Sequence, residues 1–136
     1  MGRRSSASDR RYTAPVPISQ VQLLSVPVTD VDRARAFYTD VLGFTLVRDA
    51  QMPGRRWVQV APAGGQASLA LVTWFDTMPA GSLRGLVLET SDLDVEVQRL
   101  ASFGVDVSEG ITQSPWGRSL GIADPDGNRL VLQESR

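Results

Sequence analysis

The residues available for chemistry in this chain are few, and several of the usual types are missing. Among its 136 residues there is no cysteine and no histidine, and all 14 basic residues are arginine. Thiolate nucleophiles, Cys- or His-ligated metals, a Ser-His-Asp triad and a lysine Schiff base are therefore excluded for this chain alone. Carboxylates, amides, hydroxyls, arginines and three tryptophans remain for a site.

The candidate site residues are three indoles and four polar side chains. An apolar, aromatic-edged surface with a few polar groups suits a flat small molecule, which stacks on the rings and is oriented by hydrogen bonds. The tryptophans could instead pack in the core or a dimer, the glutamate could be a solvated edge residue, and the arginine could cover a hairpin surface. The seven candidates are Trp57, Gln59, Trp74, Glu89, Trp116, Arg118 and Gln133.

The elements that would position these residues begin with a strand over 20–28. Asp30 then precedes apolar residues at helical spacing, so it is the predicted N-cap, and Gly43 is suited to the position just past the helix end. A short strand over 45–50 and a hairpin over 55–74 follow, because β-forming residues there alternate and are punctuated by glycine.

The same order of elements repeats after a linker over 76–82. The expected elements are a strand over 83–89, a helix over 91–104, a short strand over 105–111, and strands over 117–123 and 129–135 that flank "DPDGN". "TDVD" (29–32) and "SDLD" (91–94) superpose at an offset of 62 residues. We therefore predict an α+β fold of two βαβββ modules, about 20–75 and 83–135, related by a pseudo-two-fold and forming a cupped mixed sheet.

The overall composition is that of an ordinary globular domain. Apolar residues make up 42% and charged residues 21%, and the net charge of −1 gives no reason to expect nucleic acid or a membrane surface as partner. No run of about 18 apolar residues could span a membrane. Residues 1–17 are polar and arginine-rich without an apolar leader, so we expect a flexible tail, then a single domain over 18–136, in the cytoplasm.

Two long segments resemble a known superfamily. "PVTDVDRARAFYTDVLGF" (27–44) and "WGRSLGIADPDGNRLVLQ" (116–133) together are similar to the vicinal oxygen chelate superfamily, the glyoxalase, bleomycin-resistance and extradiol-dioxygenase fold. The resemblance covers residues 20–134 and implies a glyoxalase-like fold and a homodimer. It constrains function less, because the superfamily includes lyases, dioxygenases, thiol transferases and drug-binding proteins.

The resemblance also implies where a metal would bind. In metal-dependent members the ligands come from the first and last strands of each module, and in this sequence those positions are Leu23, Ala70, Gly85 and Val131. None has a side chain that binds a metal, so we expect a degenerate site with no metal and no other cofactor. "DPDGN" is expected to be a hairpin turn and not a calcium loop, because its glycine comes too early and no loop-ending glutamate follows.

Three functions remain compatible with these observations. The leading hypothesis is a metal-free protein that binds a small, aromatic or planar molecule in its central cup. The first alternative is a cofactor-independent enzyme that uses Glu89 as acid or base, with Gln59 or Arg118 in support. The second is a lyase or dioxygenase of the same superfamily with a metal site that is not recognisable here.

Overall fold

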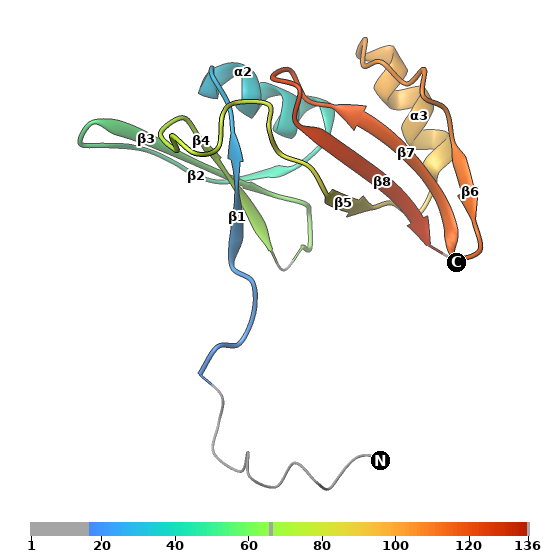
Figure 1. The fold of residues 1–136 in the computed structure, drawn as a ribbon, viewed down its shortest axis with the longest axis horizontal. Helices are drawn as coiled ribbons and strands as arrows, with labels where there is room; N and C mark the ends of the chain where they lie inside the picture. The colour runs from blue at the N-terminus through green and yellow to red at the C-terminus, as the bar shows by residue number, and fades with distance from the viewer. Residues whose placement is uncertain (1–16, 66, 136) are drawn as a thin grey trace, which may run out of the picture.

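Two four-stranded mixed sheets, each with a helix, make up the fold (Figure 1). The computed structural model describes residues 17–65 and 67–135, so nearly all of the predicted N-terminal tail lies outside the described residues. The α+β class and the two-module, glyoxalase-like architecture are confirmed. Among the described residues, no helix is both long and apolar enough to cross a bilayer.

The first module contains one helix and the strands of the first sheet, in the order β1-β4-β3-β2. Its first and last strands pair in parallel, and the other pairs are antiparallel. Its elements are β1 (Leu23–Pro27), α2 (Val31–Ala36), a π-helical turn η2 (Phe37–Val41), β2 (Thr45–Met52), β3 (Arg55–Ala61) and β4 (Ser68–Val72).

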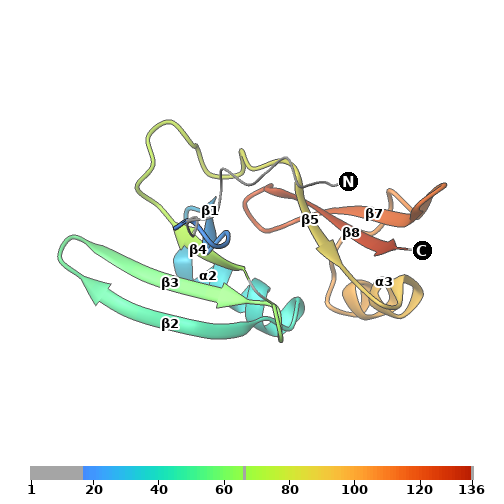
Figure 2. The ribbon, with the colours of Figure 1, turned by 90° about the horizontal axis from the view of Figure 1, so that it is seen from below.

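The second module repeats this topology, with strand order β5-β8-β7-β6. Its elements are β5 (Leu86–Glu89), α3 (Leu93–Ser102), β6 (Thr112–Ser114), β7 (Gly117–Ala123) and β8 (Arg129–Ser135). Figure 2 shows the two sheets side by side, with β1 and β4 of the first and β5 of the second nearest the middle of the molecule.

Both helices start at aspartates that the repeat relates. Asp30 accepts a hydrogen bond from the Arg33 amide at 3.1 Å, and Asp92 accepts one from the Val95 amide at 3.1 Å. Each carboxylate satisfies a backbone donor that has no partner within the helix. The predicted N-cap at Asp30 is therefore confirmed, and its equivalent 62 residues later acts in the same way.

One predicted strand is absent. Residues 105–111 form no strand, because Val105, Val107 and Ile111 pack against the core instead of pairing. Glycines at 104 and 110, both with positive φ near 80°, turn the chain before and after this segment. The short strand of this module is β6, which starts one residue later and pairs with β7.

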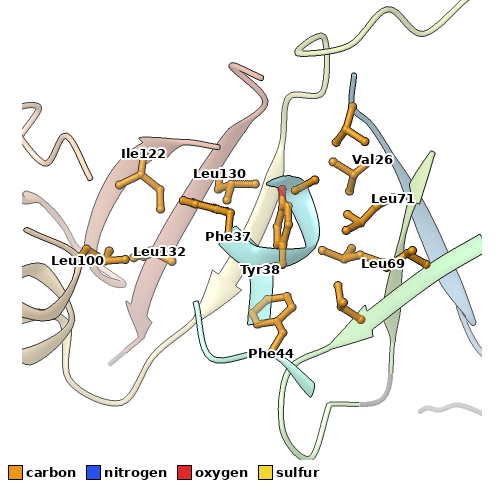
Figure 3. Close-up of a cluster of buried hydrophobic side chains, with 14 of the residues drawn as sticks. Val26, Phe37, Tyr38, Phe44, Leu69, Leu71, Leu100, Ile122, Leu130 and Leu132 are labelled. Atoms are coloured by element: carbon orange, nitrogen blue, oxygen red, sulfur yellow. The ribbon is translucent and has the colours of Figure 1, made fainter. Parts of the chain in front are cut away.

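The core joins the two modules. Figure 3 shows Phe37 and Tyr38 between apolar side chains of the two sheets, with Leu130 of β8 on one side and Leu71 of β4 on the other. Tyr38 has no exposed surface, which agrees with its predicted core position. Because the first helix packs against both sheets, the modules share one hydrophobic core.

A network of hydrogen bonds around "DPDGN" also connects the modules, and we call Tyr38, Asp124 and Asn128 the turn latch. The Tyr38 hydroxyl donates to Asp124 Oδ2 at 2.9 Å. Asn128 Nδ2 donates to the Pro27 carbonyl and to Asp124 Oδ2, both at 2.8 Å. Its Oδ1 accepts from the Leu83 amide at 3.0 Å. The turn therefore fixes the position of the second module against β1 and the first helix.

Candidate functional site

The first sheet has one face toward the core and one face away from it. Val58 and Val60 of β3 and Leu69 and Leu71 of β4 are buried in the shared core. Side chains alternate along a strand, so the residues between them point the other way. We call this second side the outer face of the first sheet, and it is the side that the strand pattern predicts for Trp57 and Gln59.

Three aromatic rings and one guanidinium gather on this outer face, and we call Trp57, Trp74, Phe75 and Arg55 the indole cluster. The Trp57 and Trp74 ring centroids are 6.3 Å apart with the ring planes tilted by 30°. Phe75 meets the edge of Trp74 at 6.1 Å, and the Arg55 guanidinium carbon lies 4.6 Å from the centroid of Trp74. These distances lie within the ranges of favourable aromatic and cation–π contacts.

A chain of hydrogen bonds ties the cluster to the sheet. Trp57 Nε1 donates to Gln59 Oε1 at 3.1 Å, and Gln59 Nε2 donates to Ser68 Oγ at 2.7 Å. Ser68 Oγ in turn lies 3.3 Å from the Gln22 carbonyl, to which it donates. An indole N–H can only donate, so Gln59 must present its oxygen to Trp57 and its NH₂ to Ser68. The amide is held in one orientation and keeps one N–H and one lone pair for a ligand.

A row of four side chains crosses the outer face of the first sheet. Across the sheet, Ser25, Ala70, Gln59 and Arg48 lie opposite one another on β1, β4, β3 and β2. Ala70 is fully buried. Beyond Phe75 lies a groove of about 330 Å³ with both polar and apolar lining, which includes Val72, Thr73 and Met78. The outer face therefore combines flat rings and one fixed amide, with a groove beside Phe75.

The predicted residues of the second module lie on the other sheet. Glu89 and Gln133 are register partners on β5 and β8, and Ser119 lies opposite Gln133 on β7. Figure 1 shows β5 and β8 on the opposite side of β1 and β4 from the β2–β3 hairpin. No contact in the described chain joins Glu89 or Gln133 to the indole cluster. The structure of one chain thus separates residues that the sequence prediction assigned to one cup.

Glu89 is exposed and lines two grooves between the modules, of about 360 and 350 Å³. Phe44, Pro62 and Leu88 also line both grooves. Glu96 and Arg99 of α3 border the first groove, where they pair with each other at 2.8 Å. Among the described residues, this is the one place where a predicted site residue of the second module meets residues of the first.

Arg118 lies on the helix side of its sheet and not on the side that was predicted to bind a ligand. It donates to Asp94 of α3 and to Glu134 of β8, both at 2.9 Å, on the helix side. The guanidinium holds the pKa of the Asp94 carboxyl below its ordinary value. The same arrangement occurs 62 residues earlier, where Arg56 pairs with Asp32 at 2.7 Å. Arg118 therefore attaches a helix to a sheet, and the repeat offset was the signal that sequence reasoning overlooked.

Trp116 lies apart from the other indoles, in the turn between β6 and β7, and its surface is 70% exposed. The binding roles of all seven residues stay predictions. Sequence reasoning did not include Arg55, Phe75 and Arg48 among the candidate site residues. Arg55 has the same strand parity as Trp57, so alternation alone could have found it, whereas Phe75 follows the end of β4 and no strand pattern reaches it.

The four positions at which relatives hold a metal offer no donor atoms. Leu23 and Ala70 lie on the outer face of the first sheet, and Val131 lies opposite Gly121 in the second. Gly85, the fourth position, has no side chain. Within residues 17–65 and 67–135, no group of three or more acidic side chains is arranged to hold a metal ion. The side chains present at these positions do not fit the metal of metal-dependent relatives.

Comparison with known proteins identifies relatives that share the fold and much of the sequence. TnmS3, described as an antibiotic binding protein from Streptomyces sp. CB03234, is 48% identical, with 90% of this chain and 100% of that one covered and a TM-score of 0.86. A superfamily member from Sphaerobacter thermophilus DSM 20745 is 33% identical, covering 87% and 98%, with a TM-score of 0.80. YetH of Bacillus subtilis (strain 168) is 31% identical over 121 residues, which are 86% of this chain and 99% of YetH.

The fold, the repeat and these relatives lead to one assignment. The family model described as "Glyoxalase/Bleomycin resistance protein/Dioxygenase superfamily" matches residues 18–132, and the chain belongs to that superfamily.

Proposed function

We propose that this protein binds a small planar aromatic molecule on the outer face of the first sheet, without a metal and without changing the molecule chemically. The observation that carries the proposal is the Trp57–Trp74 pair, whose rings lie 6.3 Å apart beside an amide held in one orientation. An antibiotic is the ligand class that we favour, since a relative with 48% identity is an antibiotic binding protein.

Stacking and one directed amide account for recognition in this proposal. A flat ring against the indoles removes apolar surface from water, which supplies most of the affinity. The free N–H and lone pair of Gln59 then select ligands with a matching polar group at the ring edge. The groove beside Phe75 provides space of about 330 Å³ for a second part of the ligand.

The test is a titration of the full chain with two- and three-ring aromatic compounds, read by tryptophan emission and by calorimetry. Trp57→Ala and Trp74→Ala should each weaken binding about tenfold or more, since each removes stacking area. Trp57→Phe should lose less affinity than Trp57→Ala. It replaces Trp57→Ala in the test if the alanine variant does not fold. Trp116→Ala, at the exposed indole, is the matched control and should bind like the parent. Equal losses in all three alanine variants would contradict the proposal.

The metal-free part of the proposal has its own test. Elemental analysis after exposure to Mn, Fe, Ni and Zn should find far less than one ion per chain. A stoichiometric ion would revive the lyase or dioxygenase alternative and would require ligands other than Leu23, Ala70, Gly85 and Val131.

A cofactor-independent enzyme that uses Glu89 is the second candidate. Glu89 favours it because this carboxylate lines both grooves between the modules. For such an enzyme Glu89→Gln must abolish turnover of a substrate while leaving its binding intact. For the binding protein that we propose, the same variant keeps full affinity for aromatic ligands.

We also propose that two copies pair in the cytoplasm. Exposed apolar side chains support pairing, since Val87 of the second sheet is 56% exposed and Val47 of the first is 51% exposed. Light scattering after size exclusion should give twice the mass of 14.8 kDa, and a single-chain mass at micromolar concentration would contradict pairing.

A further inference from the structure

The strands of the first sheet carry positive charge on their outer face and no negative charge there. Nine arginines lie in the described part of the chain. Six of them pair with a carboxylate within 4.0 Å, and Arg84 donates to two backbone carbonyls at 2.8 Å. The six are Arg33, Arg35, Arg56, Arg99, Arg118 and Arg129. Arg48 and Arg55 are the two without a carboxylate or carbonyl partner among residues 17–65 and 67–135.

Arg55 belongs to the indole cluster, and Arg48 lies near it on the same face. Arg55 precedes Trp57 by two residues on β3 and lies over the ring of Trp74. Arg48 lies directly opposite Gln59 in the β2–β3 register, so the two side chains share a face. The cations therefore flank the fixed amide and the rings.

The four described strands of the first sheet place no acidic residue on the same face. Asp49 is the only acidic residue in the four strands of the first sheet. Its carboxylate accepts from Arg56 at 2.8 and 2.9 Å on the helix side of the sheet. The strands thus put both unpaired cations on one face and their single anion on the other.

We propose that the ligand of this face is a planar aromatic anion, such as an aryl carboxylate or a phenolate. This inference rests on the proposed function, in which the indole cluster holds the ring. The guanidiniums of Arg48 and Arg55 then bind the anionic substituent, with charge-assisted and potentially bidentate hydrogen bonds. A planar cation would meet two like charges on the same surface, so the face discriminates by charge as well as by shape.

The experiment compares three probes of one shape: 2-naphthoate, 2-naphthamide and 2-naphthylmethylammonium. Calorimetry with the full chain should give about tenfold tighter binding for the carboxylate than for the amide, and the weakest binding for the ammonium. Raising the salt concentration should reduce the difference in affinity between the carboxylate and the amide, because salt screens the charge interaction. Arg48→Gln and Arg55→Gln should each reduce the ratio of carboxylate affinity to amide affinity, whereas Arg84→Gln, the matched control, should leave that ratio unchanged.

The other outcomes separate this inference from the proposed function. If the three probes bind equally, the proposed function stands and the anionic ligand is refuted. If none binds, the proposed function fails and this inference fails with it. If Arg48→Gln or Arg55→Gln instead changes the oligomeric state, the arginines serve contact with a second copy, and the anionic ligand is again refuted.

Discussion

The turn latch gives the sharpest prediction about how the two modules are held together. Asn128 is fully buried, and its side chain makes three hydrogen bonds, with the Leu83 amide, the Pro27 carbonyl and the Asp124 carboxylate. In Asn128→Ala the Pro27 carbonyl keeps the Gly81 amide at 3.3 Å, but the Leu83 amide loses its partner. An unsatisfied buried donor costs about 1–3 kcal/mol, and the lost bond to the Asp124 carboxylate adds to this. We expect the free energy of unfolding to fall by about 3 kcal/mol.

Tyr38→Phe should lower the free energy of unfolding less than Asn128→Ala does. Asp124 loses the Tyr38 hydroxyl but keeps its bonds from Asn128 and from the Asp126 and Asn128 amides. No buried donor is left unpaired, so the cost is that of one hydrogen bond to a charged acceptor, about 1.5 kcal/mol. Gln113→Ala, at an exposed amide on β6, is the control and should change stability by less than about 0.5 kcal/mol.

The assay is urea unfolding at fixed protein concentration, followed by tryptophan emission. Trp116→Phe leaves indoles in the described chain only in the first module, and Trp57→Phe with Trp74→Phe leaves one only in the second. Both reporters should give the same midpoint, since the modules share a core and a latch. Two separate midpoints, or a loss below about 0.5 kcal/mol in Asn128→Ala, would refute the reasoning.

Three further predictions concern single groups. Burial and the Asp124 carboxylate raise the pKa of Tyr38 well above its ordinary value of 10.0, so Tyr38 should resist ionisation in the folded chain. Because the unfolded chain ionises more easily, the free energy of unfolding should fall as the pH rises above about 10. This fall should be absent in Tyr38→Phe. The Leu93 amide first, and Arg118 second, hold the pKa of Glu134 below its ordinary value of 4.5, so in an NMR titration Arg118→Gln should raise this pKa only partway. Gly117→Ala should lower the free energy of unfolding by about 2 kcal/mol or more, because φ there is +148° and a Cβ would overlap the Glu134 carbonyl. In Gly121→Ala the added Cβ meets only flexible side-chain ends, so thermal melts should show a change in stability of less than about 1 kcal/mol.

Strand alternation predicted which side chains share a face, and it did so correctly for Trp57, Gln59 and Ala70. It could not predict which faces meet, because that depends on how the first helix packs between the sheets. Glu89 and Gln133 lie on strands of the second module, as predicted, but the sheets of one chain do not bring them together with Trp57 in one cup. Residues 105–111 show the same limit, since alternation there reflects burial against the core and not strand pairing.

The offset of 62 residues also separates structural positions from candidate site positions. The helix caps Asp30 and Asp92 correspond, and so do the pairs Arg56–Asp32 and Arg118–Asp94. Each of these contacts attaches a helix or its first turn, and each module needs them for the same reason. Residues that hold a βαβββ unit together are therefore present twice.

The outer-face residues of the first sheet have no such counterparts. At the same offset, Arg55, Trp57 and Gln59 become Gly117, Ser119 and Gly121. The missing side chains leave space that the second module fills itself, since the ion pair between Glu109 and Arg129 lies against Gly121 and the Gln133 amide lies against Gly117. One outer face is thus covered by its own chain, while the other presents rings, an amide and two unpaired cations. Packing within the first module explains none of the latter, so these side chains are the ones on which the proposed binding rests, and that proposal concerns the first module alone.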